Sequence, residues 1–353
     1  MTQQDSHTHL WPGVPLALGS AVLFGATPPL SKLLLQNTQP FMLAGLLYLG
    51  AGLGLALYNL LRRGAGQAQE AGLTRKDMPW LALAIVLGGI VAPVLLMWGL
   101  ALTTASAGSL LLNLEGLATL GIAWLVYKES VDRRLLFGAI AILAGATLLS
   151  WTGEGVSINP GAALVVLACV AWGLDNNFTR KISAADPAAI ATAKGLVAGS
   201  VNVAIALAMG GSLPAHQTIM FAAILGVFGI GVSLVMFILA LRHLGTARTG
   251  AYYALAPFIG GVIAVALLSE PLTLTLALAG GLMALGLYLH LSERHEHEHQ
   301  HDVLEHEHMH VHDAHHQHAH HSSVAEAHSH IHRHEPMRHK HPHFPDLHHR
   351  HGH

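Results

Sequence analysis

Two acidic side chains interrupt segments of the chain that are otherwise apolar, and the first of them is Glu115. It lies about ten residues into a segment of about 23, close to the middle of a helix long enough to span a bilayer. A carboxylate at that depth can carry a proton, bind a cationic group of a substrate or pair with a basic side chain. Its alternative role is structural, as a protonated acid that donates to a neighbouring carbonyl. The amide of Asn113, two residues earlier, would belong to the same site.

The second acidic residue, Asp175, lies before the end of the apolar segment 161–182. Lys194 follows beyond the next turn at nearly the same distance, so two antiparallel helices would bring both charges to one depth, where pairing lowers the cost of burying them. The pair is either a fixed structural ion pair or one that breaks and re-forms in transport; alternatively, Asp175 reaches the lipid headgroups. Asn176 and Asn177 come next, and successive helix residues point about 100° apart, so at least one of the three must bond to a neighbouring helix.

Apolar segments long enough to cross a bilayer recur along most of the chain. Of its 353 residues, 52% are hydrophobic and 11% are charged, whereas about a quarter of the residues are charged in soluble domains. This pattern predicts an all-α polytopic membrane protein of about ten transmembrane helices. The expected spans are roughly 14–34, 40–61, 79–102, 105–127, 135–151, 160–182, 188–209, 217–241, 246–268 and 272–291.

The basic residues are distributed unequally between the two sides of the predicted membrane. With the N-terminus inside, eleven lysines and arginines fall in cytoplasmic loops, and only Lys32 falls on the other side. The positive-inside rule then places both termini in the cytoplasm, and we expect an inner-membrane or plasma-membrane protein. The eleven are Arg62, Arg63, Arg75, Lys76, Lys128, Arg133, Arg134, Arg180, Lys181, Arg242 and Arg248.

The chain contains an internal repeat. Residues 105–130 align with residues 246–271, which sets Glu129 opposite Glu270 at the ends of equivalent helices. Because each unit has about five spans, an odd number, the second copy enters from the other side of the membrane. The sequence therefore predicts two inverted repeats with a substrate site near the midplane between them. The expected divisions are a cytoplasmic N-terminus (1–13), two five-helix repeats (14–151 and 160–291) and a cytoplasmic tail (292–353).

These features resemble the drug/metabolite transporter superfamily, EamA type, over residues 14–291. Three features carry the resemblance: Trp172-Gly173 at the start of the second repeat, Ala240-Leu241 before a short loop, and the two glutamates that close equivalent helices. Trp172-Gly173 aligns with Phe24-Gly25 in the first repeat. The resemblance implies a secondary carrier for small metabolites, amino acids or drugs, often by proton-linked export. For Glu129 and Glu270 themselves, their place at helix ends favours capping or loop bonds.

The sequence shows no convincing motif of a soluble enzyme. It contains no P-loop and no G-x-S-x-G, and H-E-x-x-H occurs only within the alternating histidines of the tail, at 295–299, 297–301 and 306–310, so we expect a transporter that is not an enzyme, requires no cofactor and binds no nucleic acid. An ATP-driven pump would need a motor from another subunit. The expected partners are the lipid bilayer and a small-molecule or metal-ion substrate, and a homodimer remains an open alternative to a monomer.

The composition changes completely from His295 onward, since 24 of the 29 histidines lie between His295 and His353. Many alternate with other residues, which places them on one side of an extended chain, and neutral imidazole suits zinc, nickel, cobalt and copper. We expect a tail that is disordered without metal and binds several such ions. The candidate ligands are His295, His297, His299, His301, His306, His308, His310, His312, His328, His330, His332 and His334.

The sequence thus favours an exporter that works by alternating access, with a small molecule or a divalent transition metal as its cargo and the tail as a collector or sensor. One alternative is an amino-acid, drug or metabolite exporter in which the tail only regulates. Another is a membrane-tethered metal buffer or sensor that transports nothing. The tail could also act as a pH-dependent charge switch near anionic lipid, because histidine titrates close to physiological pH.

Overall fold

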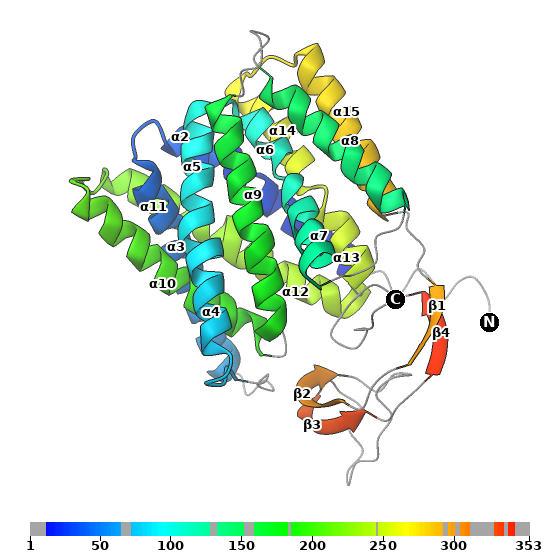
Figure 1. Cartoon of the computed structure of the whole chain (residues 1–353). Coiled ribbons are helices and arrows are strands. Elements are labelled where there is room, and N and C mark those ends of the chain that lie inside the picture. Colours follow the sequence, from blue (N-terminus) through cyan, green and yellow to red (C-terminus); the bar gives the residue numbers. More distant parts are fainter. Residues whose placement is uncertain are drawn as a thin grey trace.

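The computed structural model describes residues 12–64, 72–127, 133–151, 159–182, 185–244 and 246–291, with four short tail segments at 296–300, 304–310, 328–334 and 338–342. Ten helices in this part of the chain are long and apolar enough to cross a membrane, which confirms the predicted fold class. They pack side by side as a helical bundle (Figure 1).

Interrupted helices form three of the five spans in the first half of the chain. The elements are α1 (Gly13–Gly25) with α2 (Thr27–Leu34); α3 (Pro40–Gly64); α4 (Met78–Ala84), the π-helical turn η2 (Ile85–Val91) and α5 (Ala92–Leu102); α6 (Ala105–Leu111) with α7 (Leu114–Tyr127); and α8 (Arg133–Ser150). In the first span, the two prolines after Thr27 begin α2 and remove the amide hydrogens that would continue α1.

The second half repeats this order with two of the same interruptions. Its elements are α9 (Pro160–Thr179) with the 3₁₀ turn η3 (Arg180–Ile182); α10 (Pro187–Ala208); α11 (His216–Leu225), the π-helical turn η4 (Gly226–Val232) and α12 (Ser233–Leu244); α13 (Thr246–Tyr253) with α14 (Ala256–Leu268); and α15 (Leu274–Leu291). The interval from Ile85 to Gly226, where the two π-helical turns begin, is 141 residues, the same as from Ala105 to Thr246 in the aligned segments.

The two halves meet closely where α3 crosses α10. Gly52 faces Gly195, and a Cβ atom at Gly52 would lie 2.6 Å from the backbone nitrogen of Leu196. Gly45 and Gly199 form a second close approach along the same pair of helices. Small residues of this kind let helix backbones touch in a membrane protein, where tight packing is a main source of association.

In the tail, the structure pairs four short strands. The strand β1 (Glu296–Gln300) pairs antiparallel with β4 (Arg338–Pro342), and β2 (Leu304–His310) pairs antiparallel with β3 (His328–His334). These segments have the alternating sequence that gives a strand its two-residue period. The rest of the tail lies outside the described residues.

Candidate functional site

The fourth span is broken in its middle, and Glu115 lies at the break. The helix α6 ends at Leu111 and α7 begins at Leu114, so Glu115 is in the first turn of a helix that starts inside the bundle. The positive end of the helix dipole favours an acidic side chain there. Asn113 lies in the break, where its Nδ2 donates to the carbonyl of Leu110 at 2.8 Å. The same carbonyl also accepts from the backbone nitrogen of Asn113 at 3.1 Å, so the side chain of Asn113 reinforces the turn at the break.

Glu115 is half-buried, and its side chain is hydrogen-bonded by a neutral partner on α9, which packs against α7. Asn176 of α9 donates from Nδ2 to Oε1 of Glu115 and to Oγ1 of Thr119, each at 3.1 Å. Thr119 in turn donates to the backbone carbonyl of Glu115 at 2.9 Å. Asn176 is exposed even though it belongs to a predicted span. No ion pair joins Glu115 to any residue for which the structure gives a side chain.

Asp175, one residue earlier on α9, has a charged partner. It is only 2% exposed, and Lys194 of α10 donates from Nζ to its Oδ2. Thr179 donates to the other oxygen, Oδ1, at 3.1 Å. The structure thus brings together the two charges that the sequence placed at one depth, and it turns Asp175 and Asn176 toward different neighbours.

The π-helical turn η2 forms the wall against which Asp175 packs. Gly88 lies in this turn, and a Cβ atom there would overlap the carboxylate of Asp175. Pro93 follows at the start of α5 and has no amide hydrogen to donate back to this turn. The carbonyl of Gly88 instead accepts hydrogen bonds from Tyr48 Oη at 2.9 Å and Trp172 Nε1 at 3.0 Å. This role of Tyr48 was not predicted from the sequence, where the available signal is the Gly88-Gly89 pair shortly before Pro93.

Two further asparagines hold helices together. Asn177 donates from Nδ2 to the backbone carbonyls of Gly173 at 2.8 Å and of Thr119 at 3.1 Å, which joins α9 to α7. Asn202 is fully buried on α10 and donates to the carbonyl of Gly89 at 3.2 Å. Of the residues predicted for the transport site, Asn113 and Asn177 donate to backbone carbonyls. The other four form side-chain pairs, Glu115 with Asn176 and Asp175 with Lys194, and we call these four the charged set.

This charged set occupies only one of the two positions that the repeat makes equivalent. In the alignment that pairs Trp172-Gly173 with Phe24-Gly25, Asp175 corresponds to Thr27. Gly229 of η4 faces the hydroxyl of Thr27, as Gly88 of η2 faces Asp175. The counterpart of Glu115 is Ala256. The equivalent helices in the other half are therefore joined by uncharged groups, including the hydroxyls of Ser20 and Ser233, which lie 3.2 Å apart.

One end of the bundle is held by charged side chains at the turn between α5 and α6. Glu270, beyond the end of α14, accepts hydrogen bonds from the backbone nitrogens of Ala105 at 2.7 Å and Ser106 at 2.9 Å. Lys32 of α2 donates to the carbonyl of Thr103 at 2.8 Å, at the end of α5. We call these contacts the clasp. The capping role expected for Glu270 is confirmed, whereas Glu129 lies outside the described residues.

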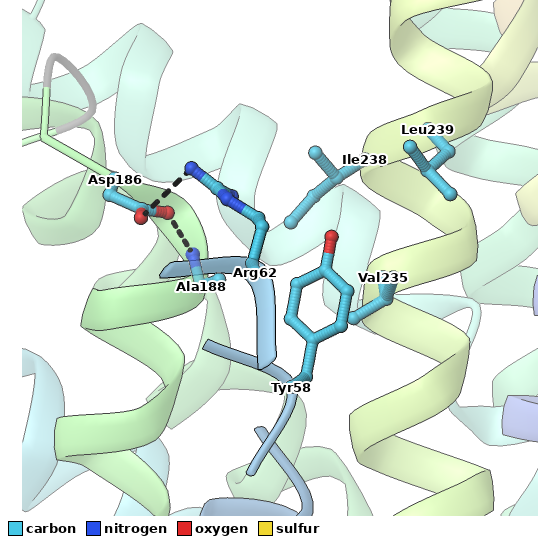
Figure 2. A pocket seen from close by; sticks show the side chains of 7 residues that line it. All are labelled: Tyr58, Arg62, Asp186, Ala188, Val235, Ile238 and Leu239. Atoms are coloured by element: carbon cyan, nitrogen blue, oxygen red, sulfur yellow. Dashed lines mark hydrogen bonds and ion pairs between the residues drawn. The ribbon is translucent and has the colours of Figure 1, made fainter. Parts of the chain in front are cut away.

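A small pocket lies near the loop ends of α3, α10 and α12, where the positive-inside rule predicts the cytoplasm. Figure 2 shows Arg62 on one wall, reaching toward Asp186 at the start of α10; their Nη2 and Oδ2 atoms are 3.7 Å apart. Asp186 also accepts from the backbone nitrogen of Ala188 at 2.9 Å. The remaining lining residues are Tyr58, Val235, Ile238 and Leu239.

The predicted metal ligands fall partly within the described residues. No group of three or more His, Cys, Asp or Glu side chains that could hold a metal ion occurs among the side chains that the structure describes. In the tail, the backbone is described at His297, His299, His306, His308, His310, His328, His330, His332 and His334. His295, His301 and His312 lie outside the described residues.

Comparisons with known proteins agree with the two halves. A model of the EamA-like transporter family matches the chain twice, over residues 11–151 and 159–292. A protein of Methanothermobacter thermautotrophicus, named as an uncharacterized transporter, is 28% identical over 293 residues, which cover 78% of this chain and 84% of that protein. A solved structure described only as "Crystal structure of protein" is similar in fold, with a TM-score of 0.58, 18% sequence identity and coverage of 79% of this chain and 95% of the other.

Proposed function

The chain belongs to the EamA-like transporter family, and from this premise we propose a secondary carrier that exports a small solute with an amino group in exchange for protons. Membership makes it a multi-pass membrane transporter and not an enzyme. The proposal adds the class of solute, the direction, and Glu115 as the group that binds the proton and the amine in turn. It also places the protein in the cell membrane with both termini in the cytoplasm, as the positive-inside rule predicts.

The observation that carries the proposal is the difference between the two neighbouring carboxylates. Asp175 has its charge balanced by Lys194, whereas the described partner of Glu115 is the neutral amide of Asn176. A charged side chain at the centre of a membrane helix costs about 2.5–3.5 kcal/mol on insertion scales, so it needs a partner. A proton or the ammonium group of a solute would each supply one, and only one of them can occupy the carboxylate at a time.

Competition for one carboxylate produces exchange. Where the site opens to the outside of an energised cell, protons are more abundant, and Glu115 takes up a proton and releases the ammonium. Where the site opens to the cytoplasm, the proton leaves and another ammonium binds. Each cycle moves a proton inward and a solute outward. The exchange is strict if the protein changes the side to which it opens only slowly when Glu115 is empty and unprotonated, because the charge is then unpaired.

The adjacent ion pair suits a second charge on the solute. Lys194 could exchange Asp175 for a solute carboxylate, while Glu115 receives the ammonium. An amino acid carries both groups on one carbon, so a zwitterion would pair with Glu115 and with Lys194, while Asp175 would keep its hydrogen bond from Thr179. This complementarity favours amino acids and related amines within the broad range of solutes that the family resemblance allows.

A divalent transition metal is the second candidate cargo, and the histidine-rich tail favours it. The tail would then collect ions for export or sense their concentration. The membrane site favours this reading less, because first-row transition ions are best held by imidazole and thiolate, and the side chains hydrogen-bonded to Glu115 and Asn176 offer carboxylate, amide and hydroxyl oxygens, with the single buried thiol of Cys169 beside them. A metabolite that complexes metal would satisfy both observations.

Counterflow into proteoliposomes tests the proposal. Vesicles with purified protein and an inside-acid or inside-alkaline gradient would be challenged with a panel of amino acids and amines and, separately, with Zn²⁺, Ni²⁺ and Co²⁺. We expect amine uptake that is accelerated by an inside-acid gradient and is lost in Glu115→Gln. Gly116→Ala is the matched control, because a Cβ atom there meets no other atom within 4 Å.

The outcomes separate the candidates. Metal uptake without amine uptake would overturn the solute class and leave the metal exporter. Uptake by Glu115→Gln with undiminished dependence on the gradient would remove Glu115 from the coupling. No uptake of any compound by correctly inserted protein would leave a membrane-tethered buffer or sensor.

A further inference from the structure

The register of the inner pair of tail strands places histidine opposite histidine at three alternate positions. In the pairing of β2 with β3, His306 is opposite His332, His308 is opposite His330, and His310 is opposite His328. Residues directly opposite in an antiparallel pair have Cα atoms about 4.5–5.5 Å apart and share a face. Alternate residues along a strand also share a face. All six histidines therefore lie on one face of this two-stranded ribbon.

The outer pair of strands has the same arrangement. In the pairing of β1 with β4, His297 is opposite His341, and His299 is opposite His339. Four histidines thus share one face of the second ribbon. The two ribbons are nested, because β1 and β4 are the first and last of the four strands along the chain.

Opposite charges occupy the other face and support this register. Glu298 is opposite Lys340 in the outer ribbon, and Glu305 is opposite Arg333 in the inner one. Cross-strand pairs of opposite charge contribute about 0.2–1 kcal/mol each. A slip of one residue would move each histidine to the other face, against these charges. The sequence therefore favours particular pairs of histidines at opposite positions, in addition to a high histidine content.

Two neighbouring cross-strand pairs suit one metal ion. They place four imidazole-bearing residues at the corners of a rectangle of about 5 by 7 Å, from the spacing between strands and the rise of two residues. Zinc takes four ligands in a tetrahedron with Zn–N distances of about 2.0–2.1 Å, and imidazole side chains are long enough to converge from such corners. The outer ribbon offers one set of four, and the inner ribbon offers one set of four with a pair to spare.

We infer that the tail holds two distinct sites for a divalent transition-metal ion, one on each ribbon, built from cross-strand histidine pairs. The outer site consists of His297, His299, His339 and His341. The inner site consists of two neighbouring pairs among the six histidines that face one another in β2 and β3. Both sites are independent of Glu115 and of the solute that the membrane part carries.

A variant with unchanged composition tests the inner site. Exchanging Ser329 with His330 and Ile331 with His332 keeps every residue of the tail but moves two histidines off the shared face of β3. The control exchanges Gln317 with His318, which belong to neither of the two described strand pairs. Full-length protein in nanodiscs, stripped of metal, would be titrated with Zn²⁺ and the bound ions counted by equilibrium dialysis.

We expect two tightly bound Zn²⁺ ions per chain in the unaltered protein and in the control, and one in the variant with the exchanged β3. Two ions of unchanged affinity in that variant would show that composition alone binds the metal and would overturn the inference. Replacing the outer set, His297, His299, His339 and His341, by glutamine should also leave one ion, and the two changes together should leave none.

The register itself can be tested without metal. Met309 and Ser329 are opposite each other in β2 and β3, at a separation that a disulfide can bridge. In a Cys169→Ser background, Met309→Cys/Ser329→Cys should form a disulfide on mild oxidation faster than Met309→Cys/His332→Cys, whose positions are three residues out of register. Equal rates would overturn the pairing on which both sites depend.

Discussion

Tyr48 and Trp172 donate to one acceptor, the carbonyl oxygen of Gly88, from helices of opposite repeats. Tyr48 belongs to α3 of the first half and Trp172 to α9 of the second, so this oxygen in the π-helical turn links the halves. Asp175 lies three residues beyond Trp172 and packs against the same glycine. The ion pair, the two aromatic donors and the π-helical turn therefore form one unit, and a change in any of them should affect the others.

Replacing Gly88 by alanine should disturb this unit most directly. The added Cβ atom would overlap the carboxylate of Asp175, and overpacking of this kind costs about 1–3 kcal/mol. We expect a lower thermal midpoint in detergent and, since about 1.4 kcal/mol corresponds to a factor of ten in rate, roughly a tenfold loss of counterflow. Gly281→Ala is the control, because nothing lies within 4 Å of a Cβ atom there. Unchanged stability in Gly88→Ala would mean that Asp175 can withdraw from the π-helical turn.

Removing the aromatic donors one at a time should show that they share an acceptor. Trp172→Phe and Tyr48→Phe each remove one hydrogen bond, at a net cost of about 0.5–1.5 kcal/mol. The double variant leaves a buried carbonyl unsatisfied, so its loss of stability should exceed the sum of the single losses. Thermal unfolding of the four proteins measures this coupling. Strict additivity would show that water or another group replaces the donors.

Breaking the Asp175–Lys194 pair distinguishes a structural from a transport role. Removing one partner of a buried pair costs about 3–5 kcal/mol, so Lys194→Met alone should reduce the amount of folded protein severely. Lys194→Met/Asp175→Asn leaves no charge unpaired and should restore folding. If the pair exchanges partners with the solute, this double variant will be folded but inactive in counterflow. Folded protein with normal counterflow would make the pair purely structural.

Weakening the clasp should change which side of the protein is open. Hydrogen bonds to charged groups contribute about 1.5–3 kcal/mol, so Glu270→Gln should favour opening at the turn between α5 and α6. We expect a cysteine introduced at Thr104 to be labelled roughly tenfold faster by a membrane-impermeant maleimide in Glu270→Gln than in the unaltered background. Lys76→Gln serves as the control for a change of charge elsewhere. Equal labelling rates would show that the clasp does not limit opening.

Much of the fold follows from the hydropathy of the sequence. The ten spans were predicted because the hydrocarbon core sets the length of an apolar helix, and the repeat was visible because Glu129 and Glu270 close aligned segments. The depth of Asp175 and Lys194 could be predicted in the same way, by counting residues from the turn that joins their helices. Such counting gives depth along the membrane normal and leaves the direction of each side chain open.

What the sequence did not reveal depends on backbone hydrogen bonds. A π-helical turn has the same apolar residues as the helix around it, so η2 and η4 leave no trace in hydropathy. The donors to Gly88 were missed for the same reason, since an aromatic residue in a span resembles an ordinary packing residue. Asn113 was predicted to share the site of Glu115, but its side-chain amide and its backbone nitrogen both donate to the carbonyl of Leu110 at the break in the helix.

The contact between α3 and α10 limits how the two halves can move. The backbones of α3 and α10 touch at Gly45/Gly199 and again at Gly52/Gly195. One helix therefore cannot slide along the other unless the larger side chains beside these glycines pass each other. A tilt of one half against the other about this contact disturbs the fewest contacts, so the contact serves as a hinge. The largest displacements are then expected at the edges of the bundle farthest from this contact. A bulky residue at any of these four glycines would block the tilt and would leave every polar group of the site unchanged.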